Sequence, residues 1–425
     1  MDVRTEFLTV RMTVSVPRNG VSVKGLEELC VAAARETFVA AARAMQESYQ
    51  RREAARLERR EWRERWVATR LGMVRVPLLK VRDRATGRTG VLGRDLLQLG
   101  PREGMSEWLA QRAVALRLAG LSYRQSAAVL RAFEMAVGSA MRVWRLVQVK
   151  GAACVAAEAA RAAAVAAAPT VPLCVPPPAL YLEADEIYLN AQRSAQPHHR
   201  VKVGLSYTGR ARQRGRVPRY RLAGKRWYGG VGSFAAFGEG WRTHLEWHHA
   251  VSHARAVLYL SDGDAGLAAL RERCFPHAIG QLDWAHVFRD LAAAAPDEAC
   301  GRRWVAHVAA GRADLTLQSL RRHRRHPDGN AVARAKVTAL LATRPAELYG
   351  WQQFRRRYDP QRQLRLPRGT GGIEKNQEIT IGRVMKRRGM AWTERGAHHL
   401  VKLIFAQSDP PIWNSLWLEP VPPLT

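Results

Sequence analysis

The chain contains few cysteines, and they are far apart. Its 425 residues include five, at positions 30, 154, 174, 274 and 300, and no Cys-x-x-Cys pair occurs. Closely spaced pairs mark zinc ribbons, and a dense cysteine framework marks small disulfide-stabilised secreted domains. The scattered pattern argues against both classes and predicts a protein of the reducing cytoplasm.

Long hydrophobic runs are also missing. The first residues, Met1 to Glu6, lack the apolar core of a signal peptide. The Ala-rich stretch from Ala152 to Ala168 carries Glu158 and Arg161 and is too short and too weakly apolar to span a bilayer. No Walker motif is present, so ATP hydrolysis is not supported. We therefore expect a soluble cytoplasmic protein with no membrane partner and no nucleotide cofactor.

Acidic residues are scarce relative to basic ones. Lys and Arg total 68 against 37 Asp and Glu, which gives a formal net charge of +31. Most of these cations are Arg, whose planar guanidinium suits phosphate recognition. A GC-rich coding sequence raises the content of Arg and Ala together and can account for part of the high Arg content. It does not account for the excess of basic over acidic residues, because a neutral surface could also use Arg paired with Glu. The imbalance therefore favours a nucleic-acid partner, with a membrane surface as the main competitor.

The composition is nevertheless that of a folded protein. An apolar fraction of 47% in 425 residues allows two or three domains with at least one buried core. Residues 1–100 are predicted to form a helical and hairpin region. Helical spacing with dense mixed charge extends from Gly25 to about Arg70, and Val74 to Val91 has the pattern of a hairpin.

Residues 101–168 have the pattern of a helix-turn-helix DNA-binding region. Three short helices are expected between positions 104 and 150, with Gly120 ending the first and Ser122 capping the second. The third helix carries Arg142 and Arg145 and is a candidate for the DNA major groove. An ordinary helical bundle explains the same spacing equally well.

A Pro-rich linker at 169–179 separates this region from residues 180–405, and residues 406–425 form a C-terminal tail. Three antiparallel-type strands are followed by an alternation of helices and strands, which predicts a mixed α/β sheet covered by helices. A helical insertion is expected at about 287–360, and a last helical segment begins near Gly372. The expected strands are Tyr181–Leu189, Val201–Tyr207, Tyr220–Trp227, Val257–Leu260 and Ile279–Leu282.

Three acids in this region indicate metal chemistry. Asp185 lies in mid-strand, where burying a charge costs several kcal/mol unless a metal ion or another charge compensates it. Asp262 lies at the carboxyl end of the fourth strand, and Glu374 begins a late helix. Two-metal phosphoryl transfer requires carboxylates that converge from different elements. Taken singly, each acid has another explanation. Asp185 could be the ion-pair partner of an Arg in the core, Asp262 could be a turn residue, and Glu374 could be an acid that is favoured at a helix N-terminus.

Two other groups of possible metal ligands are weaker. Cys274-Phe275-Pro276-His277 has suitable ligand types but no second pair. The residues His244, His248 and His249 lie with Glu246 at helical spacing, but not in the His-Glu-x-x-His order of a zinc hydrolase.

Basic residues are concentrated where the sheet is expected. From Arg200 to Arg226 there are ten Lys and Arg and no acid, and Trp227 and Tyr228 follow as possible stacking surface. A charge run is usually a solvated face, but one without any compensating acid favours DNA contact. The candidate DNA-binding residues are Arg200, Lys202, Arg210, Arg212, Arg214, Arg216, Lys225, Arg226, Lys386, Arg387 and Arg388.

Four short motifs occur in order between residues 180 and 405. They are Glu183-Ala184-Asp185, Ser261-Asp262-Gly263, Gln281-Leu282-Asp283-Trp284-Ala285-His286, and Gly372-Ile373-Glu374 followed by Arg383-Val384-Met385-Lys386-Arg387-Arg388-Gly389-Met390-Ala391-Trp392. Their order resembles the RNase H-like fold and, within it, the DDE transposases of bacterial insertion sequences. The closest likeness is to the ISLre group of the Mutator-like superfamily. The Ser122-Tyr123-Arg124 region resembles the group's N-terminal part more loosely.

The resemblance implies an RNase H-like catalytic domain in which Asp185, Asp262 and Glu374 bind two Mg²⁺ or Mn²⁺ ions. Asp283 and His286 match the (Cys/Asp)-x-x-His signature of these transposases and would have accessory roles, although His286 could also be a packed, hydrogen-bonded histidine. The implied activity is cleavage and strand transfer of double-stranded DNA, at terminal inverted repeats and a target, by a dimer or larger assembly. The rivals are an RNase H-like nuclease without strand transfer and a non-catalytic, transposase-derived DNA-binding regulator.

The chain departs from the family pattern at two positions. Asp264 follows the second acid at a place where the family usually has a small or apolar residue, which leaves the register between Asp262 and Asp264 open. We prefer Asp262, because Gly263 follows it as the motif requires. Glu186 replaces the usual small residue after Asp185 and could be a spare metal ligand or a salt-bridge partner.

Overall fold

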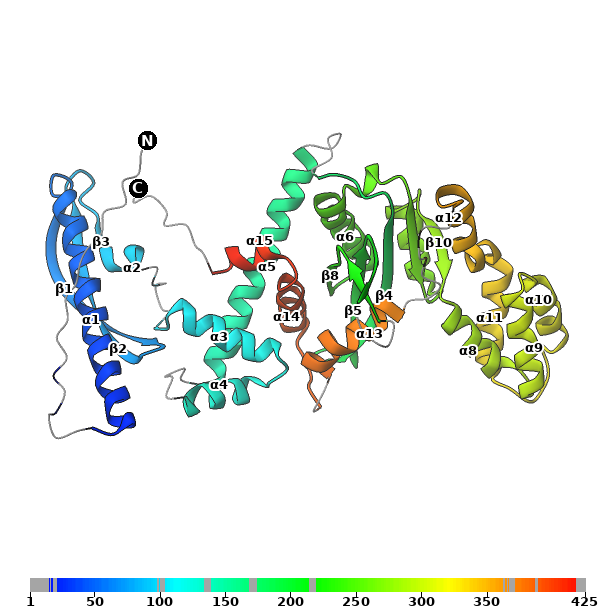
Figure 1. Cartoon of the computed structure of the whole chain (residues 1–425), viewed down its shortest axis with the longest axis horizontal. Coiled ribbons are helices and arrows are strands. Elements are labelled where there is room, and N and C mark those ends of the chain that lie inside the picture. The colour runs from blue at the N-terminus through cyan, green and yellow to red at the C-terminus, as the bar shows by residue number, and fades with distance from the viewer. Residues whose placement is uncertain are drawn as a thin grey trace. The chain divides into compact units, whose positions relative to one another are not determined.

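The computed structural model describes residues 15, 17, 21–97, 99, 104–133, 139–167, 174–213, 219–361, 364, 366, 371–386 and 389–417. They form a mixed α/β structure, as predicted (Figure 1). The chain divides into two compact units, Met1–Val149 with Asn414–Thr425, and Lys150–Trp413. The division falls inside one long helix and not in the Pro-rich segment. Of the described residues, none belongs to a helix with the length and apolarity needed to cross a bilayer.

The first unit begins with helix α1, Val23–Arg52, and a long hairpin of strands β1, Leu57–Thr69, and β2, Gly72–Asp83. The prediction of helix to about Arg70 is therefore wrong beyond Arg52. Six of the thirteen positions of β1 are exposed and three of its four buried positions lie together at its end, so its two-residue apolar alternation is weak and its charges gave the pattern of a solvated helix. Those charges pair across the hairpin instead, as Glu64 Oε2 does with Arg75 Nε at 2.7 Å.

The next short elements follow the predicted hairpin and helices. Strand β3, Thr89–Val91, pairs with β2, and helix α2 spans Leu92–Leu96. Helix α3 spans Glu107–Leu118, and helix α4 spans Tyr123–Ala132. Ser122 and Gln125 form a reciprocal capping box, which fixes the start of α4.

The third helix of the expected helix-turn-helix is not short. Helix α5 spans Ala140–Ala167, because the Ala-rich segment continues the helix that carries Arg142 and Arg145. Val137 and Gly138, which precede this helix in the sequence, lie outside the described residues, as do Pro169 and Pro172 of the linker.

The second unit is built on a five-stranded sheet in the order β10-β9-β4-β5-β8. Strands β9 and β10 run parallel to β4, whereas β5 and β8 are antiparallel to their neighbours. The strands are β4, Leu180–Asn190; β5, His198–Tyr207; β8, Arg226–Val231; β9, Val257–Ser261; and β10, Ile279–Leu282. Four of the five agree with the prediction apart from their ends.

The predicted strand Tyr220–Trp227 is two strands. Residues Arg219–Ala223 form β7, which pairs only with β6, Gly209–Gln213, in a separate hairpin. The chain turns at Gly224, whose φ of 59° lies in the left-handed region that glycine adopts readily. The next residues then join the main sheet as β8.

The two faces of β4 have different neighbours, because successive strand residues point to opposite sides. Leu180, Leu182 and Ala184 pack in a core with helices α6, Phe234–His249, and α7, Ala265–Cys274. Tyr181 lies on the other face, where its ring stacks on Tyr207 with centroids 5.2 Å apart. Glu183 and Asp185 share that second face by the same alternation, away from the core of α6 and α7.

A helical insertion follows β10, as predicted, and Figure 1 shows α8 to α11 grouped together. These helices have their own apolar core around the fully buried Trp304. A 3-10 turn at Pro345–Tyr349 then leads the chain back to the sheet. The helices are α8, Trp284–Ala294; α9, Glu298–Ala309; α10, Ala313–Arg322; α11, Ala331–Thr343; and α12, Gly350–Tyr358.

The last predicted helical segment, from Gly372 towards Ile404, is interrupted. Helix α13 spans Gly371–Gln377 and continues as a π-helix over Glu378–Lys386. A new helix, α14, begins at Glu394 and ends at Ala406. Helix α15 spans Pro410–Ser415. The π-helix directly follows the helix that carries Glu374.

Candidate active site

Asp185 lies in the middle of β4, where it pairs with Val203 of β5. Its Oδ1 accepts a hydrogen bond from the Glu186 backbone N–H at 2.7 Å. Burial raises the pKa of Asp185 to about 6, and the negative charges of Asp262 and Glu374 act in the same direction. The three predicted acids are therefore close enough to interact through their charges, although they come from three separate elements.

Strand pairing explains how Asp262 comes near Asp185. Strand β9 runs parallel to β4, and Leu260 is the partner of Glu183. Two residues further along each strand are Asp262 and Asp185. The strand pairing ends there, and Asp262 lies just past the end of β9, close enough for its charge to act on Asp185.

The side chain of Asp264 caps a helix. It is the N-cap of α7, and its Oδ1 accepts hydrogen bonds from the Gly266 N–H at 2.7 Å and the Leu267 N–H at 3.2 Å. The Asp264 N–H in turn donates to Asp262 Oδ1 at 2.9 Å. The carboxylate of Asp264 thus satisfies the start of a helix, as N-cap residues do.

Glu374 lies on α13 and contacts a histidine from the helical insertion. Its Oε1 is 3.2 Å from His286 Nε2, and His286 Nδ1 is 2.8 Å from Asp283 Oδ2. Asp283 is 1% exposed and also caps α8 through the Ala285 N–H. The hydrogen bond with Asp283 raises the pKa of His286.

Ligand atoms of Asp283, His286 and Glu374 lie within 4.8 Å of one another, which is compatible with a shared cation. The carboxylates of Asp185, Asp262 and Glu374 are hard oxygen donors, and such donors suit Mg²⁺ or Mn²⁺.

Glu183 is a site residue to which the sequence analysis assigned no role. It is fully buried, and its Oε1 accepts a hydrogen bond from the Tyr207 hydroxyl at 2.7 Å. Its Oε2 accepts from the Ile373 N–H, also at 2.7 Å, in the first turn of α13. A Cβ on Gly372 would lie 2.7 Å from Glu183 Oε1, so this close approach requires glycine. Burial raises the pKa of Glu183 to about 7, and the two hydrogen bonds oppose that rise.

Glu183 therefore ties the helix of Glu374 to the strand of Asp185. A buried acid two positions before Asp185, together with the Gly-Gly pair before Glu374, is the sequence signal that could have revealed this contact.

Glu186 is a salt-bridge partner in the structure. It forms an ion pair with Arg200, and its Oε1 lies 3.4 Å from Lys202 Nζ. Lys202 is 5% exposed, and its ammonium also lies over the ring of Phe234. Lys202, a predicted DNA contact, is therefore buried and paired with an acid in the structure.

Two other predicted DNA-binding residues, Lys225 and Arg226, line a pocket of about 720 Å³ beside α13. Four basic side chains line it, and we call it the basic pocket: Arg221, Lys225, Arg226 and Lys375. Lys225 Nζ donates to Asn376 Oδ1 at 3.1 Å, which connects this pocket to the helix of Glu374.

The remaining residues that were predicted to contact DNA differ in where they lie. Arg210 lies close enough to Glu183 for its charge to lower the pKa of that carboxyl, so it faces the site. Lys386 is exposed at the end of the π-helix. The side chains of Arg212, Arg214, Arg216, Arg387 and Arg388 lie outside the described residues.

The fold and the site define a mixed α/β protein with converging carboxylates beside a basic pocket. Residues 17–417 match the family model described as an uncharacterised protein family (UPF0236). This match covers most of the chain, so the chain belongs to that family. None of the curated proteins matches it.

Proposed function

We propose that the chain is a DDE transposase of the kind found in bacterial insertion sequences, similar to the ISLre group. It would cleave DNA at the element's ends and join those ends to target DNA. The observation that carries the proposal is the convergence of Asp185, Asp262 and Glu374 from β4, the end of β9 and α13. The sheet order β10-β9-β4-β5-β8 supports an RNase H-like domain, since three antiparallel strands precede two parallel ones on the other side of the first strand.

Asp185, Asp262 and Glu374 would hold two Mg²⁺ or Mn²⁺ ions. When bound, such ions activate water and neutralise the charge that develops on the phosphate. Water attacks a phosphodiester at the element end and releases a 3′-hydroxyl. That hydroxyl then attacks a target phosphodiester, so that one bond forms as another breaks. The acids act as ligands throughout, so no covalent enzyme intermediate forms.

Other residues of the chain would position these groups. His286, held by Asp283, orients Glu374, and Glu183 holds the start of α13 against β4. The basic pocket would hold DNA phosphates beside Glu374, because Lys375 lies on the same helix and Lys225 contacts it. Arg142 and Arg145 of α5 are candidates for recognition of the terminal inverted repeats. We expect a dimer or larger assembly on paired DNA ends in the bacterial cytoplasm.

A strand-transfer assay tests the proposal against both rivals. The full chain is incubated with Mg²⁺, labelled DNA that carries the element's ends, and a target plasmid. Cleavage with joining supports a transposase. Cleavage without joining would indicate a nuclease, and binding without cleavage would indicate a regulator.

The two neighbouring acids after β9 should respond differently to neutralisation. We expect Asp262→Asn to abolish joining, because Asp262 is the acid that interacts with Asp185. Asp264→Asn should retain most of the activity, since Asn also caps helices well and the cap of α7 is preserved. Rates of both variants in the strand-transfer assay check this. Loss of activity in Asp264→Asn alone would reverse the assignment.

Removing the carboxyl of Glu183 should slow joining by about 10- to 100-fold, the usual effect of losing a group that orients a metal ligand. In Glu183→Ala the Ile373 N–H and the Tyr207 hydroxyl lose their acceptor. In Glu183→Gln the amide can accept from Ile373 and donate to Tyr207, so most of the rate should return. Rates and apparent Mn²⁺ affinity are measured on variants with a wild-type circular dichroism spectrum. A folded Glu183→Ala variant with the wild-type rate and Mn²⁺ affinity would contradict the positioning role.

A further inference from the structure

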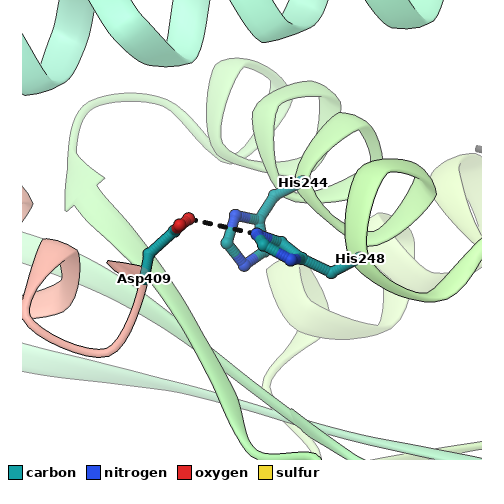
Figure 2. A group of neighbouring side chains, drawn as sticks. All are labelled: His244, His248 and Asp409. Carbon is teal, nitrogen blue, oxygen red and sulfur yellow. Dashed lines mark hydrogen bonds and ion pairs between the residues drawn. The ribbon is translucent and has the colours of Figure 1, made fainter. Parts of the chain in front are cut away.

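A second group of possible metal ligands lies away from the three acids. His244 and His248 are one turn apart on α6, and Asp409 immediately precedes α15 (Figure 2). One ligand atom from each of these residues lies within 4.8 Å of the others. His248 Nε2 is 3.1 Å from Asp409 Oδ2, and the two imidazole centroids are 4.5 Å apart.

The geometry is close to what a tetrahedral ion requires. Zinc bonds to imidazole nitrogen and carboxylate oxygen are about 2.0–2.2 Å long, so neighbouring ligand atoms lie roughly 3.3–3.6 Å apart. Two histidines at positions i and i+4 share one face of a helix, which is the spacing used by helical zinc sites. Asp409 is brought to this face from 161 residues further along the chain. Small side-chain rotations would bring all three atoms to bonding distance.

His244 provides a second, independent observation. Its Nε2 is buried and has no hydrogen-bond partner among the residues that the structure describes. A buried, unsatisfied polar atom costs about 1–3 kcal/mol, and a bound cation would satisfy it. Burial also holds the pKa of His244 well below its usual value, which keeps the imidazole in the neutral form that binds metals.

The surroundings of Asp409 are compatible with a cation at this place. Arg161 NH2 donates to Asp409 Oδ1 at 2.9 Å, while Arg161 NH1 contacts Oδ2 and lies 3.2 Å from His248 Nε2. A positive group thus already lies between His248 and Asp409. A metal ion bound to Asp409 Oδ2 and His248 Nε2 would replace the Arg161 NH1 contacts with both atoms, so the guanidinium must turn away for the ion to bind.

Neighbouring histidines and acids have other partners. His249 Nε2 pairs with the Ser206 hydroxyl at 3.0 Å, and Glu246 accepts from the Ser252 N–H. Lys402 Nζ pairs with Glu158 Oε2 at 2.6 Å. The possible metal ligands of this group are therefore His244, His248 and Asp409. They do not follow the His-Glu-x-x-His order of a zinc hydrolase.

We propose that His244, His248 and Asp409 form a zinc site that fastens the segment beginning at Asp409 to α6. Two imidazole nitrogens favour Zn²⁺ over Mg²⁺, which prefers an all-oxygen set. The three ligands leave one position for water. This site is independent of the proposed strand-transfer activity.

Zinc stoichiometry of the full chain tests the proposal. The protein is prepared without a polyhistidine tag, stripped with a chelator, reloaded with Zn²⁺ and dialysed, and zinc per chain is measured by mass spectrometry. We expect one tightly bound zinc in the wild type. His244→Ala and His248→Ala should bind it about 100-fold more weakly or worse, since losing a direct ligand should exceed the effect of losing an outer-shell partner. His277→Ala, which changes an exposed histidine, is the matched control.

Two further measurements separate this site from others and from misfolding. His286→Ala should keep the zinc, because His286 belongs to the group around Glu374. Zinc should raise the melting temperature of the wild type but not that of the folded His248→Gln variant. Absence of bound zinc in the wild type, or loss of zinc in His286→Ala with retention in His248→Ala, would overturn the proposal. Neither measurement uses DNA, so failure of the proposed function would leave this result unaffected.

Discussion

Neutralising Asp185 or Glu374 should reduce strand transfer by about 10³-fold or more. Metal ions at such a site contribute several kcal/mol of transition-state stabilisation, and each 1.36 kcal/mol corresponds to about tenfold in rate. Asp185→Asn and Glu374→Gln keep the size of the side chain but remove the charge that holds the ions. Single-turnover joining rates at saturating DNA measure the effect.

Binding of DNA should change much less than the rate in these variants. The cations that would contact phosphate line the basic pocket and remain in place. Glu394→Gln is the matched control, because Glu394 is an exposed acid on α14, outside the converging group. Full joining activity in either Asp185→Asn or Glu374→Gln would refute the metal-binding triad. An equal loss of DNA binding and joining would point to a structural role instead.

The sheet of the second unit could be predicted because its strands carry strong local signals. Strands β9 and β10 are short buried strands followed by Asp262 and Asp283, and the pairing of β9 with β4 runs up to Leu260 and Glu183, two residues before Asp262 and Asp185. The preference for Asp262 over Asp264 rested on the following glycine. The structure adds a physical reason, since the Asp264 carboxylate caps α7.

Other features could not be predicted because they depend on contacts between distant residues. Strand β1 is stabilised by pairing with β2, and its exposed charged residues mask the two-residue apolar alternation that is typical of a strand. Glu183 meets the Ile373 N–H across 190 positions of sequence. Lys202 belongs to a basic run, yet the fold buries it against Glu186. The local composition therefore revealed that the run from Arg200 to Arg226 is basic, but it did not reveal which of its cations are accessible to a partner.

DNA binding should weaken steeply with salt, by roughly 10³- to 10⁵-fold between 50 and 200 mM if about 6–10 phosphates are contacted. Each protein cation that contacts a phosphate releases condensed counterions, and added salt opposes that release. Arg200 and Lys202 are already paired with Glu186, so they should contribute little to this slope. The basic pocket should contribute more.

Single substitutions can locate the cations responsible. Replacing Lys225 or Arg221 by Gln should lower the slope of log affinity against log salt by about one and weaken binding to all sequences alike. Arg302→Gln, on the exposed face of α9 and outside the pocket, should leave the slope unchanged. Affinities measured by fluorescence anisotropy at several salt concentrations give these slopes. A flat salt dependence in the wild type would refute the electrostatic interface. If the slope is steep but neither Lys225→Gln nor Arg221→Gln lowers it, the DNA interface lies outside the basic pocket.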